Sequence, residues 1–247
     1  VERSRGLGDV YKRQGPGDPD LLTLAAVRAI EQADLIAAPV ARPDAESMAA
    51  RIARRWIKPD QPQLSLLFPM VEASEPRLRA WTAAADALAT EVSAGKQVVL
   101  LCEGDASLFA TGSYVLLSLR KRHPDCAVRV IPGITSLAAT AAAAAWPLAL
   151  QQDQLLVLPC PDTERELEAL LDQADAQGQV LALLKLGRRW LWLRPLLEQR
   201  GLLAQALFAE RVGWPDQCVA PADQIPVGER PYFSLLLIRQ RWPEVLP

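Results

Sequence analysis

Three glycine-bearing turns hold the residues whose types and spacing are suited to chemistry. They read GPGDP at 15–19, EGD at 103–105 and PGITS at 132–136. The chain has no P-loop and no GxGxxG pattern, and Asp18 and Asp105 would put negative charge where a helix start binds phosphate. Pro16 and Pro19 also remove backbone N–H donors. The turns therefore favour a cationic or hydrogen-bond-donating ligand, such as a nucleoside with ribose hydroxyls and a positively charged tail.

The EGD turn directly follows a run that is typical of a buried strand. Residues 98–102 read VVLLC, and a short apolar run of this kind is expected in a parallel sheet covered on both faces. The turn after such a strand lies at the carboxyl edge of the sheet, where open α/β folds bind ligands. The alternative, that Asp105 only caps the following helix, stays open at this point, and the two roles are compatible.

Composition and charge exclude several classes of function. The 247 residues are 50% hydrophobic with a formal net charge of −2, so bulk charge does not draw the chain to nucleic acid. The cysteines Cys102, Cys126, Cys160 and Cys218 lie far apart without a CxxC pair, and His123 is the only histidine. Neither a metal site nor a disulfide framework is supported, and we expect Cys102 and Cys160 to act as buried small hydrophobes. A catalytic triad would have to use His123, which lies in a polar connector.

The sequence does not predict a membrane span or a secretory signal. Its apolar stretches stay shorter than the roughly 18 residues that a spanning helix needs, and the first residues lack a signal-peptide pattern. We therefore expect a soluble cytoplasmic protein.

Strands and helices are predicted to alternate through the first half of the chain. Strands are expected at 35–40, 63–68, 98–102 and 127–131. Helices are expected at 21–34, 47–57, 75–94 and 136–145, and after the EGD turn to about residue 122. Asp18 and Ser136 are suitable N-caps, Pro19 suits a first helical position, and Gly95 suits a helix end. This alternation indicates βαβ units and a mainly parallel sheet.

A second lobe is predicted after a stretch without strong periodicity at 146–153. Strands are expected at 155–158, 180–186, 203–212 and 232–240, and helices at 163–174 and 194–200. Pro195 is expected near the start of the last helix. The predicted domains are an N-terminal α/β domain at 15–147 and a C-terminal α/β domain at 148–247.

The three turns, in their order and context, resemble one known family. GPGDPDLLTLAAVRAI, LLCEGDASLFATGSYVLL and VRVIPGITSLAATAAAAAWPLA are similar to the tetrapyrrole (corrin/porphyrin) methyltransferases that use S-adenosylmethionine. The EGD turn before FATGSY, the PGITS turn and the late KLGRR are most similar to members that methylate precorrin-2 at C-20, giving precorrin-3A in cobalamin biosynthesis. The resemblance runs from Gly15 to about Arg241.

The resemblance implies the fold, the cofactor and the assembly. It implies an α/β protein of two domains, each a mixed sheet flanked by helices, with the cofactor S-adenosylmethionine in a cleft between them. It also implies a homodimer, a small-molecule tetrapyrrole substrate, and no nucleic-acid or membrane partner.

Site residues follow from the resemblance position by position. The residues expected at the cofactor are Pro16, Gly104, Asp105, Leu108, Thr135, Ser136, Leu186, Ala209 and Phe233. Because the substrate carries many carboxylates, Arg188, Arg189 and Arg211 are candidates to bind it, although solvated surface charge is the preferred interpretation of each one taken singly. Glu103 is the acidic group nearest by position, but no residue is identified as the catalytic base. No metal ligand is expected.

Two further features of the sequence bear on these roles. Trp190 and Trp192 could stack on a macrocycle, but a hydrophobic contact between lobes or subunits is the preferred interpretation. Trp146 is interpreted as core at the junction of the lobes.

The chain departs from the family pattern at two places. Ala106 stands where the family has proline after GD, which changes the rigidity of the turn more than its chemistry. Residues 1–14 (VERSRGLGDVYKRQ) are an atypical or foreign segment where the family runs an apolar first strand into GPGD. We therefore expect the native first strand to be missing, which would leave its ladder partners unpaired.

Several related activities stay open. The acceptor is either metal-free precorrin-2 or its cobalt-bearing counterpart, and no metal-ligand pattern decides between them. Methylation of uroporphyrinogen III, of a modified histidine on a protein, or of ribosomal RNA is also compatible with this fold, although the near-neutral charge disfavours RNA. A protein that binds the cofactor but is inactive, owing to its disrupted first strand, is the non-enzymatic alternative.

Overall fold

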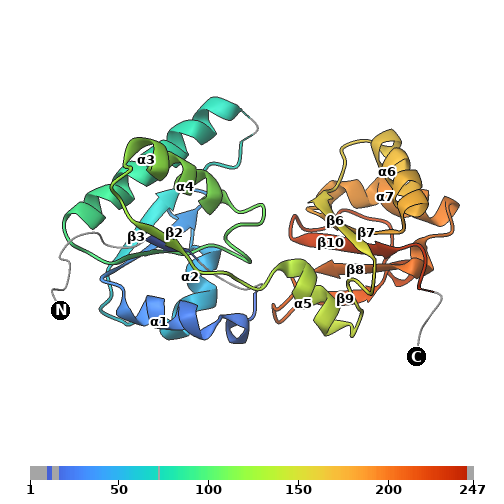
Figure 1. The fold of residues 1–247 in the computed structure, drawn as a ribbon, viewed down its shortest axis with the longest axis horizontal. Helices are drawn as coiled ribbons and strands as arrows, with labels where there is room; N and C mark the ends of the chain where they lie inside the picture. The colour runs from blue at the N-terminus through green and yellow to red at the C-terminus, as the bar shows by residue number, and fades with distance from the viewer. Residues whose placement is uncertain (1–9, 13–16, 72, 244–247) are drawn as a thin grey trace. The chain divides into compact units, whose positions relative to one another are not determined.

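Two compact units make up the chain, one up to residue 135 and one from residue 136 onward (Figure 1). They are seen in a computed structural model that describes residues 10–12, 17–71 and 73–243. Each unit holds a five-stranded sheet with helices packed on it, so the predicted α/β class is confirmed. The domain boundary predicted near residue 147 stays a prediction.

The first sheet has the strand order β3-β2-β4-β1-β5, and all of its described pairings are parallel. Its strands are β1 (Val10–Lys12), β2 (Leu35–Val40), β3 (Gln63–Leu67), β4 (Val98–Leu100) and β5 (Val128–Val130). Its helices are α1 (Leu24–Gln32), α2 (Met48–Ala53), α3 (Ser74–Ser93) and α4 (Thr111–Arg122). Because the strands are parallel, the turns after β1, β4 and β5 leave the sheet at the same edge.

Burial on both faces explains the apolar runs of the first sheet. Helices α3 and α4 cover one face, and α1 and α2 cover the other (Figure 1). Neighbouring residues of β4 point to opposite faces, yet Val98 is 0% and Val99 2% exposed. One face packs Leu100 with Leu88 and Leu119 in a single cluster. The interpretation of 98–102 as a strand buried on both sides is therefore confirmed.

The expectation of a missing first strand is wrong for residues 10–12. These residues form β1, which pairs in parallel with β4 (Val10 with Val98) and with β5 (Val10 with Val128). Val10 and Tyr11 are of residue types that favour extended backbone. The ladder groups of β4 and β5 that face this position therefore have a partner strand. Whether residues 1–14 are native stays open.

The second sheet is mixed, with the order β6-β7-β10-β8-β9. Its strands are β6 (Gln154–Pro159), β7 (Gln179–Leu184), β8 (Ala206–Glu210), β9 (Cys218–Pro221) and β10 (Ser234–Arg239). Strands β6 and β7 are parallel, whereas β10 is antiparallel to both of its neighbours, β7 and β8. Helices α6 (Glu164–Gln177) and α7 (Trp190–Gln199) lie together on one face (Figure 1), and α5 (Ser136–Ala143) precedes the sheet.

Trp190 is part of the core of the second unit. Its side chain is 0% exposed, lies beside Phe208 with ring centroids 4.8 Å apart, and donates its indole N–H to the Pro226 carbonyl at 3.0 Å. Trp192 is partly buried against the same cluster. The interpretation of Trp190 as a contact between lobes or subunits is therefore wrong, and stacking on a macrocycle is excluded for a side chain with no exposed surface.

Two helix starts also differ from the prediction. Asp18 caps a short 3-10 turn at Pro19–Leu21, and Thr23 caps α1 instead. Helix α7 begins at Trp190, so Pro195 lies inside it rather than near its start. Burial of Trp190, Leu193 and Leu197 outweighs the local cost of proline in that helix.

Candidate ligand site at the strand ends

The EGD and PGITS turns meet at the carboxyl edge of the first sheet. Oδ2 of Asp105 accepts a hydrogen bond from the Gly133 N–H at 2.6 Å. Its Oδ1 accepts one from the Ser107 N–H at 2.8 Å and another from the Ser107 hydroxyl. Helix α4 begins only at Thr111, with Ala110 as its N-cap, so the interpretation of Asp105 as the cap of that helix is wrong. Asp105 instead joins two turns that are 28 residues apart in the chain.

Glycine is required at 133 because the two turns touch there. A Cβ on Gly133 would overlap the carbonyl oxygen of Gly104 and lie 3.0 Å from the Cα of Asp105. Gly104 itself has φ +69°, in the left-handed region. The PGITS turn was predicted from the sequence, but the special role of Gly133 was not. The contact between two turns that are distant in the chain produces no recognisable pattern in the local sequence.

Glu103 lies between these fixed residues and the strand. Its side chain is partly buried, and burial raises the pKa of its carboxyl to about 6. Further along the turn, Ala106 is 2% exposed and its carbonyl accepts the Ser113 hydroxyl at 3.0 Å, so helix α4 holds the turn from the other side. Leu108 donates its N–H to the Asp105 carbonyl at 3.3 Å.

The remaining predicted positions of this edge are partly described. Pro16 lies outside the described residues, but its turn follows β1, which lies between β4 and β5. Thr135 and Ser136 are partly buried after β5, and the Ser136 carbonyl accepts the Thr140 hydroxyl at 2.8 Å as α5 begins. The sheet order thus brings the EGD and PGITS turns to one edge.

The predicted residues of the second unit gather at one edge of its sheet. Because β10 runs against β7 and β8, its first residues meet their last ones. Leu186 N–H donates to the Ser234 carbonyl at 3.2 Å, and Arg211 N–H donates to the Phe233 carbonyl at 2.9 Å. Leu186 and Ala209 are apolar and 0% exposed, so their side chains form the packed support behind this edge and present no polar group. Phe233 is 43% exposed.

Strained backbone accompanies these turns. Phe109 (φ 52°), Lys185 (φ 62°) and Arg211 (φ 49°) have left-handed conformations although none is glycine. Such conformations cost about 1–3 kcal/mol each and are common at binding sites. Phe109 and Lys185 were not predicted as site residues, since backbone angles of this kind are set by tertiary contacts.

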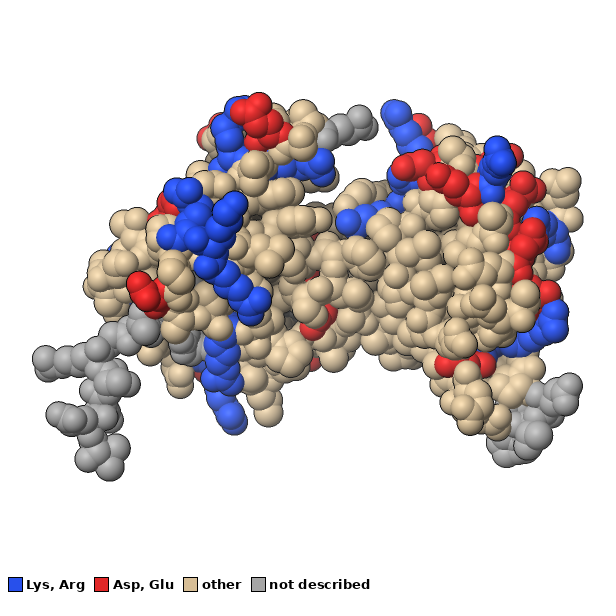
Figure 2. All heavy atoms as spheres, turned by 45° about the horizontal axis from the view of Figure 1, so that its top comes forward, with Lys and Arg blue, Asp and Glu red and all other residues tan. Residues whose placement is uncertain are grey.

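The three candidate arginines already have acidic partners. Arg188 lies 3.3 Å from Glu229, Arg189 pairs with Asp162, and Arg211 pairs with Asp216. Figure 2 shows basic and acidic side chains next to one another along the upper and right margins of this unit. Exposed pairs of this kind are weak and exchange partners at little cost. Each arginine can therefore be surface charge or can turn to a substrate carboxylate.

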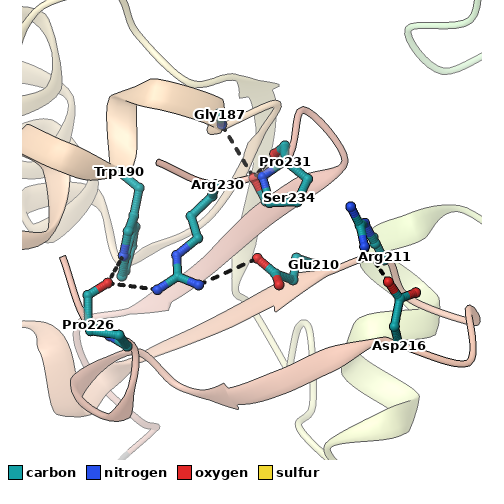
Figure 3. A network of polar contacts seen from close by, with 9 residues as sticks. All are labelled: Gly187, Trp190, Glu210, Arg211, Asp216, Pro226, Arg230, Pro231 and Ser234. Atoms are coloured by element: carbon teal, nitrogen blue, oxygen red, sulfur yellow. Dashed lines mark hydrogen bonds and ion pairs between the residues drawn. The ribbon is translucent and has the colours of Figure 1, made fainter. Parts of the chain in front are cut away.

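A partly buried ion pair lies behind the second edge (Figure 3). The guanidinium of Arg230 lies 3.9 Å from Oε2 of Glu210, and donates to the Pro226 carbonyl at 2.8 Å. Trp190 donates to the same carbonyl, so the pair is fixed against the core. Nothing in the sequence singled out Arg230, because its partner is distant in the chain.

Metal and membrane signals are missing from the described residues. Within them, no group of three or more His, Cys, Asp or Glu side chains could hold a metal ion. None of the described helices is long and apolar enough to cross a membrane. Cys102 and Cys160 are buried, as predicted, and burial raises the pKa of the Cys160 thiol to about 12, which keeps it unreactive at neutral pH.

Comparison with known sequences identifies relatives over nearly the whole chain. The profile of the family described as Tetrapyrrole (Corrin/Porphyrin) Methylases matches residues 14–224. A cobalt-precorrin-2 C(20)-methyltransferase from Salmonella typhimurium is 35% identical over 92% of this chain and 94% of its own length. A precorrin-2 C(20)-methyltransferase from Sinorhizobium sp is 33% identical over 91% of each chain.

Solved structures share the fold. The methyltransferase CobJ aligns with a TM-score of 0.67 at 23% identity, over 95% of this chain and 94% of that chain. A uroporphyrin-III C-methyl transferase from Thermus thermophilus, solved with S-adenyl homocysteine, aligns with a TM-score of 0.61 at 22% identity, over 94% and 92% of the two chains.

Proposed function

Because the chain belongs to the tetrapyrrole (corrin/porphyrin) methylase family, we propose that it is an S-adenosylmethionine-dependent methyltransferase that methylates precorrin-2 at C-20. The product is precorrin-3A, an intermediate of cobalamin biosynthesis. The observation that carries this proposal is the alignment of two C-20 methyltransferases with more than nine tenths of the chain. The EGD and PGITS turns, found independently from the sequence, lie where such folds bind ligands.

The described residues fit S-adenosylmethionine better than a phosphorylated cofactor. The turns at the first edge present carboxylates and no lysine or arginine, which suits a sulfonium and an ammonium rather than phosphate. Gly104, Asp105, Leu108, Thr135 and Ser136 would hold it from the first edge and the start of α5. Phe233, which is 43% exposed, would contribute an apolar contact. Leu186 and Ala209, which have no exposed surface, would support the site from behind, and Pro16 completes the proposed set.

The cofactor, when bound, supplies an activated methyl group, and the chain has to position the acceptor carbon and keep water out. Turns that are fixed by the Asp105–Gly133 hydrogen bond and by the contact of Gly104 with Gly133 suit that task. A fixed site lowers the barrier by orienting the reactants before they react. Arg188, Arg189 and Arg211 would bind the peripheral carboxylates of the tetrapyrrole, leaving their present acidic partners.

A second candidate substrate is the cobalt-bearing form of precorrin-2. It is favoured by one observation, the Salmonella relative whose name specifies the cobalt-bearing substrate. The two candidates share the reaction and the acceptor carbon, and differ only in the metal at the centre of the ring.

One assay separates these candidates. Purified protein is titrated with S-adenosylmethionine by calorimetry and is then incubated with precorrin-2, cobalt-precorrin-2 or uroporphyrinogen III, with mass analysis of each product. We expect cofactor binding and a singly methylated product from one of the first two substrates. Methylation of uroporphyrinogen III alone would move the assignment within the family, and binding without any product would mean a protein that only binds the cofactor.

The resemblance to the family also leads us to propose a homodimer and a cytoplasmic location. Light scattering after size exclusion tests the first, because a dimer has twice the mass of the 27.0 kDa chain.

A further inference from the structure

Glu103 differs from the other acidic residues of the three turns. Oδ1 of Asp18 accepts the Asp20 N–H at 2.8 Å, and both oxygens of Asp105 accept hydrogen bonds from Ser107 and Gly133. Within the part of the chain that the structure describes, neither a hydrogen bond nor an ion pair reaches the Glu103 side chain. Glu103 is therefore a partly buried carboxylate without a protein partner at the carboxyl edge of the sheet, where folds of this class bind ligands.

Among the described residues, the donors of the neighbouring turn and helix bond to groups other than Glu103. In the β5–α5 turn, the Gly133 N–H donates a hydrogen bond to Asp105. In α4, the Ser113 hydroxyl donates to the Ala106 carbonyl. The one charged neighbour in its own turn is Asp105, whose oxygens are already bonded. Burial is accordingly the cause of the raised pKa of Glu103, about 6.

We propose that Glu103 is the general base of the reaction, which removes the proton from the acceptor carbon of the macrocycle. This inference rests on the proposed C-20 methyl transfer. The acceptor carbon uses a π electron pair of the macrocycle to form the new C–C bond, and the sulfur keeps the pair of the S–C bond that breaks. The C–H bond at C-20 then breaks, its electron pair returns to the macrocycle, and the proton passes to a Glu103 oxygen and on to water.

The two neighbouring carboxylates therefore have different roles. Asp105 is a positioning residue, because it links the EGD turn to Gly133. Both of its carboxylate oxygens already accept hydrogen bonds from the protein, which makes it a poorer base than Glu103. Glu103 is held next to it by a backbone that reverses at Gly104. A carboxyl group whose pKa is close to 6 is ionised at neutral pH and is more basic than an ordinary glutamate, which suits proton removal.

The test compares Glu103→Gln, Glu103→Ala and the control Glu31→Gln with the wild type. Glu31 is an exposed residue of α1 that lies outside every turn discussed. Single-turnover methyl transfer to precorrin-2 and cobalt-precorrin-2 is followed from about pH 5 to about pH 8, the range that brackets a base of this pKa. Calorimetry with S-adenosylmethionine and urea unfolding verify that each variant binds and folds.

We expect Glu103→Gln to bind the cofactor normally and to lose about 10²- to 10⁴-fold in the transfer rate. The wild-type rate should rise with pH through about 6 and then level off, whereas Glu103→Gln should lack that rise. Formate or acetate should restore activity to Glu103→Ala, with more basic carboxylates restoring more, which a merely structural role would not produce.

The outcomes separate the two proposals. A wild type that is active on either substrate, together with a Glu103→Gln rate within about threefold of it, would overturn the role of Glu103 alone. Loss of activity without rescue by any carboxylate, or with a flat wild-type pH profile, would also overturn it. A wild type that binds the cofactor but methylates neither substrate would overturn the proposed function, and the role of Glu103 with it.

Discussion

Asp105 shows how one side chain can shape a ligand site through its bonds to the protein. Its two oxygens accept three hydrogen bonds from Ser107 and Gly133, so its charge is shared with backbone and hydroxyl donors of the protein. Charge-assisted bonds of this kind are about twice as strong as neutral ones. The residue therefore sets the shape of the turn that carries Glu103 and Gly104.

Replacing Asp105 with asparagine should loosen that turn. The amide keeps the size of the side chain but lacks the charge and one acceptor oxygen, so we expect a loss of about 1–3 kcal/mol in unfolding free energy. Affinity for S-adenosylmethionine should fall about tenfold or more, equivalent to roughly 1.4 kcal/mol. Calorimetry and urea unfolding measure both effects. Asp60→Asn, at an exposed turn, is the matched control, and unchanged affinity in Asp105→Asn would remove Asp105 from this role.

Sequence reasoning identified the chemical residues of the first edge but not their partners. Glu103, Gly104 and Asp105 were found because a charged turn after a buried strand is a local pattern. The bond from Gly133 to Asp105 spans 28 residues and depends on the order of strands in the sheet, which no local pattern reports. For the same reason, the complete burial of Leu186 and Ala209 became visible only in the fold.

At the scale of elements, the contact between the β4–α4 and β5–α5 turns is the feature most open to test. We expect Gly133→Ala to push these turns apart, because the new methyl group would overlap the Gly104 carbonyl. The cost should be about 1–3 kcal/mol of unfolding free energy, as for other overpacked sites, with weaker cofactor binding.

Gly228→Ala is the control for that substitution, since a Cβ at residue 228 would meet nothing within 4 Å. Urea unfolding and calorimetry on both variants make the comparison. Equal stability and equal affinity in the two variants would contradict the proposed contact between the turns.

The strand β10 is anchored by a buried charge, which predicts a dependence of stability on pH. Arg239 is 1% exposed and its guanidinium lies 2.5 Å from Asp153, which is 14% exposed. Burial alone would raise the pKa of Asp153, but the hydrogen bonds from Arg239 and Leu150 and the charge of Arg239 outweigh it and lower the pKa. The carbonyls of Pro147 and Leu148 both accept hydrogen bonds from Nη2 of the guanidinium, whereas its Nε–H has no partner among the described residues.

The sign of this effect follows from the lowered pKa. A carboxyl with a lower pKa in the folded state adds stability above its unfolded value of about 4, and that stability is lost as the pH falls below it. Urea unfolding between about pH 7 and about pH 3 should therefore show a steeper acid loss in the wild type than in Asp153→Asn. Parallel curves for the two proteins would exclude this ion pair as a source of acid sensitivity.

Most elements could be predicted, and the exceptions have physical causes. β2 was expected at 35–40 and is found at Leu35–Val40, because its apolar run has clear polar limits. Pro195 was placed near a helix start by a local rule, but apolar residues on either side of it are buried in the core of the second unit. β9 (Cys218–Pro221) is short and partly exposed, so its sequence carries no strong strand pattern.

At the scale of the whole molecule, each unit has its own core. One cluster contains Leu88, Leu100 and Leu119 of the first unit, and the other contains Trp190, Phe208 and Leu236 of the second. The two-lobe organisation was predicted from the alternation of strands and helices on either side of residues 146–153. The assignment to a family required more, namely three turns in a fixed order, since each turn alone is a weak signal.

The proposed function is tested most directly by the carbon atom to which the methyl group is transferred. Precorrin-2 and its cobalt-bearing form are each incubated with the protein and with S-adenosylmethionine carrying a ¹³C-labelled methyl group, and the product is analysed by NMR. We predict one new methyl signal, coupled to the meso carbon C-20. A label attached to any other carbon, or no label in either macrocycle while the protein binds the cofactor, would contradict the account.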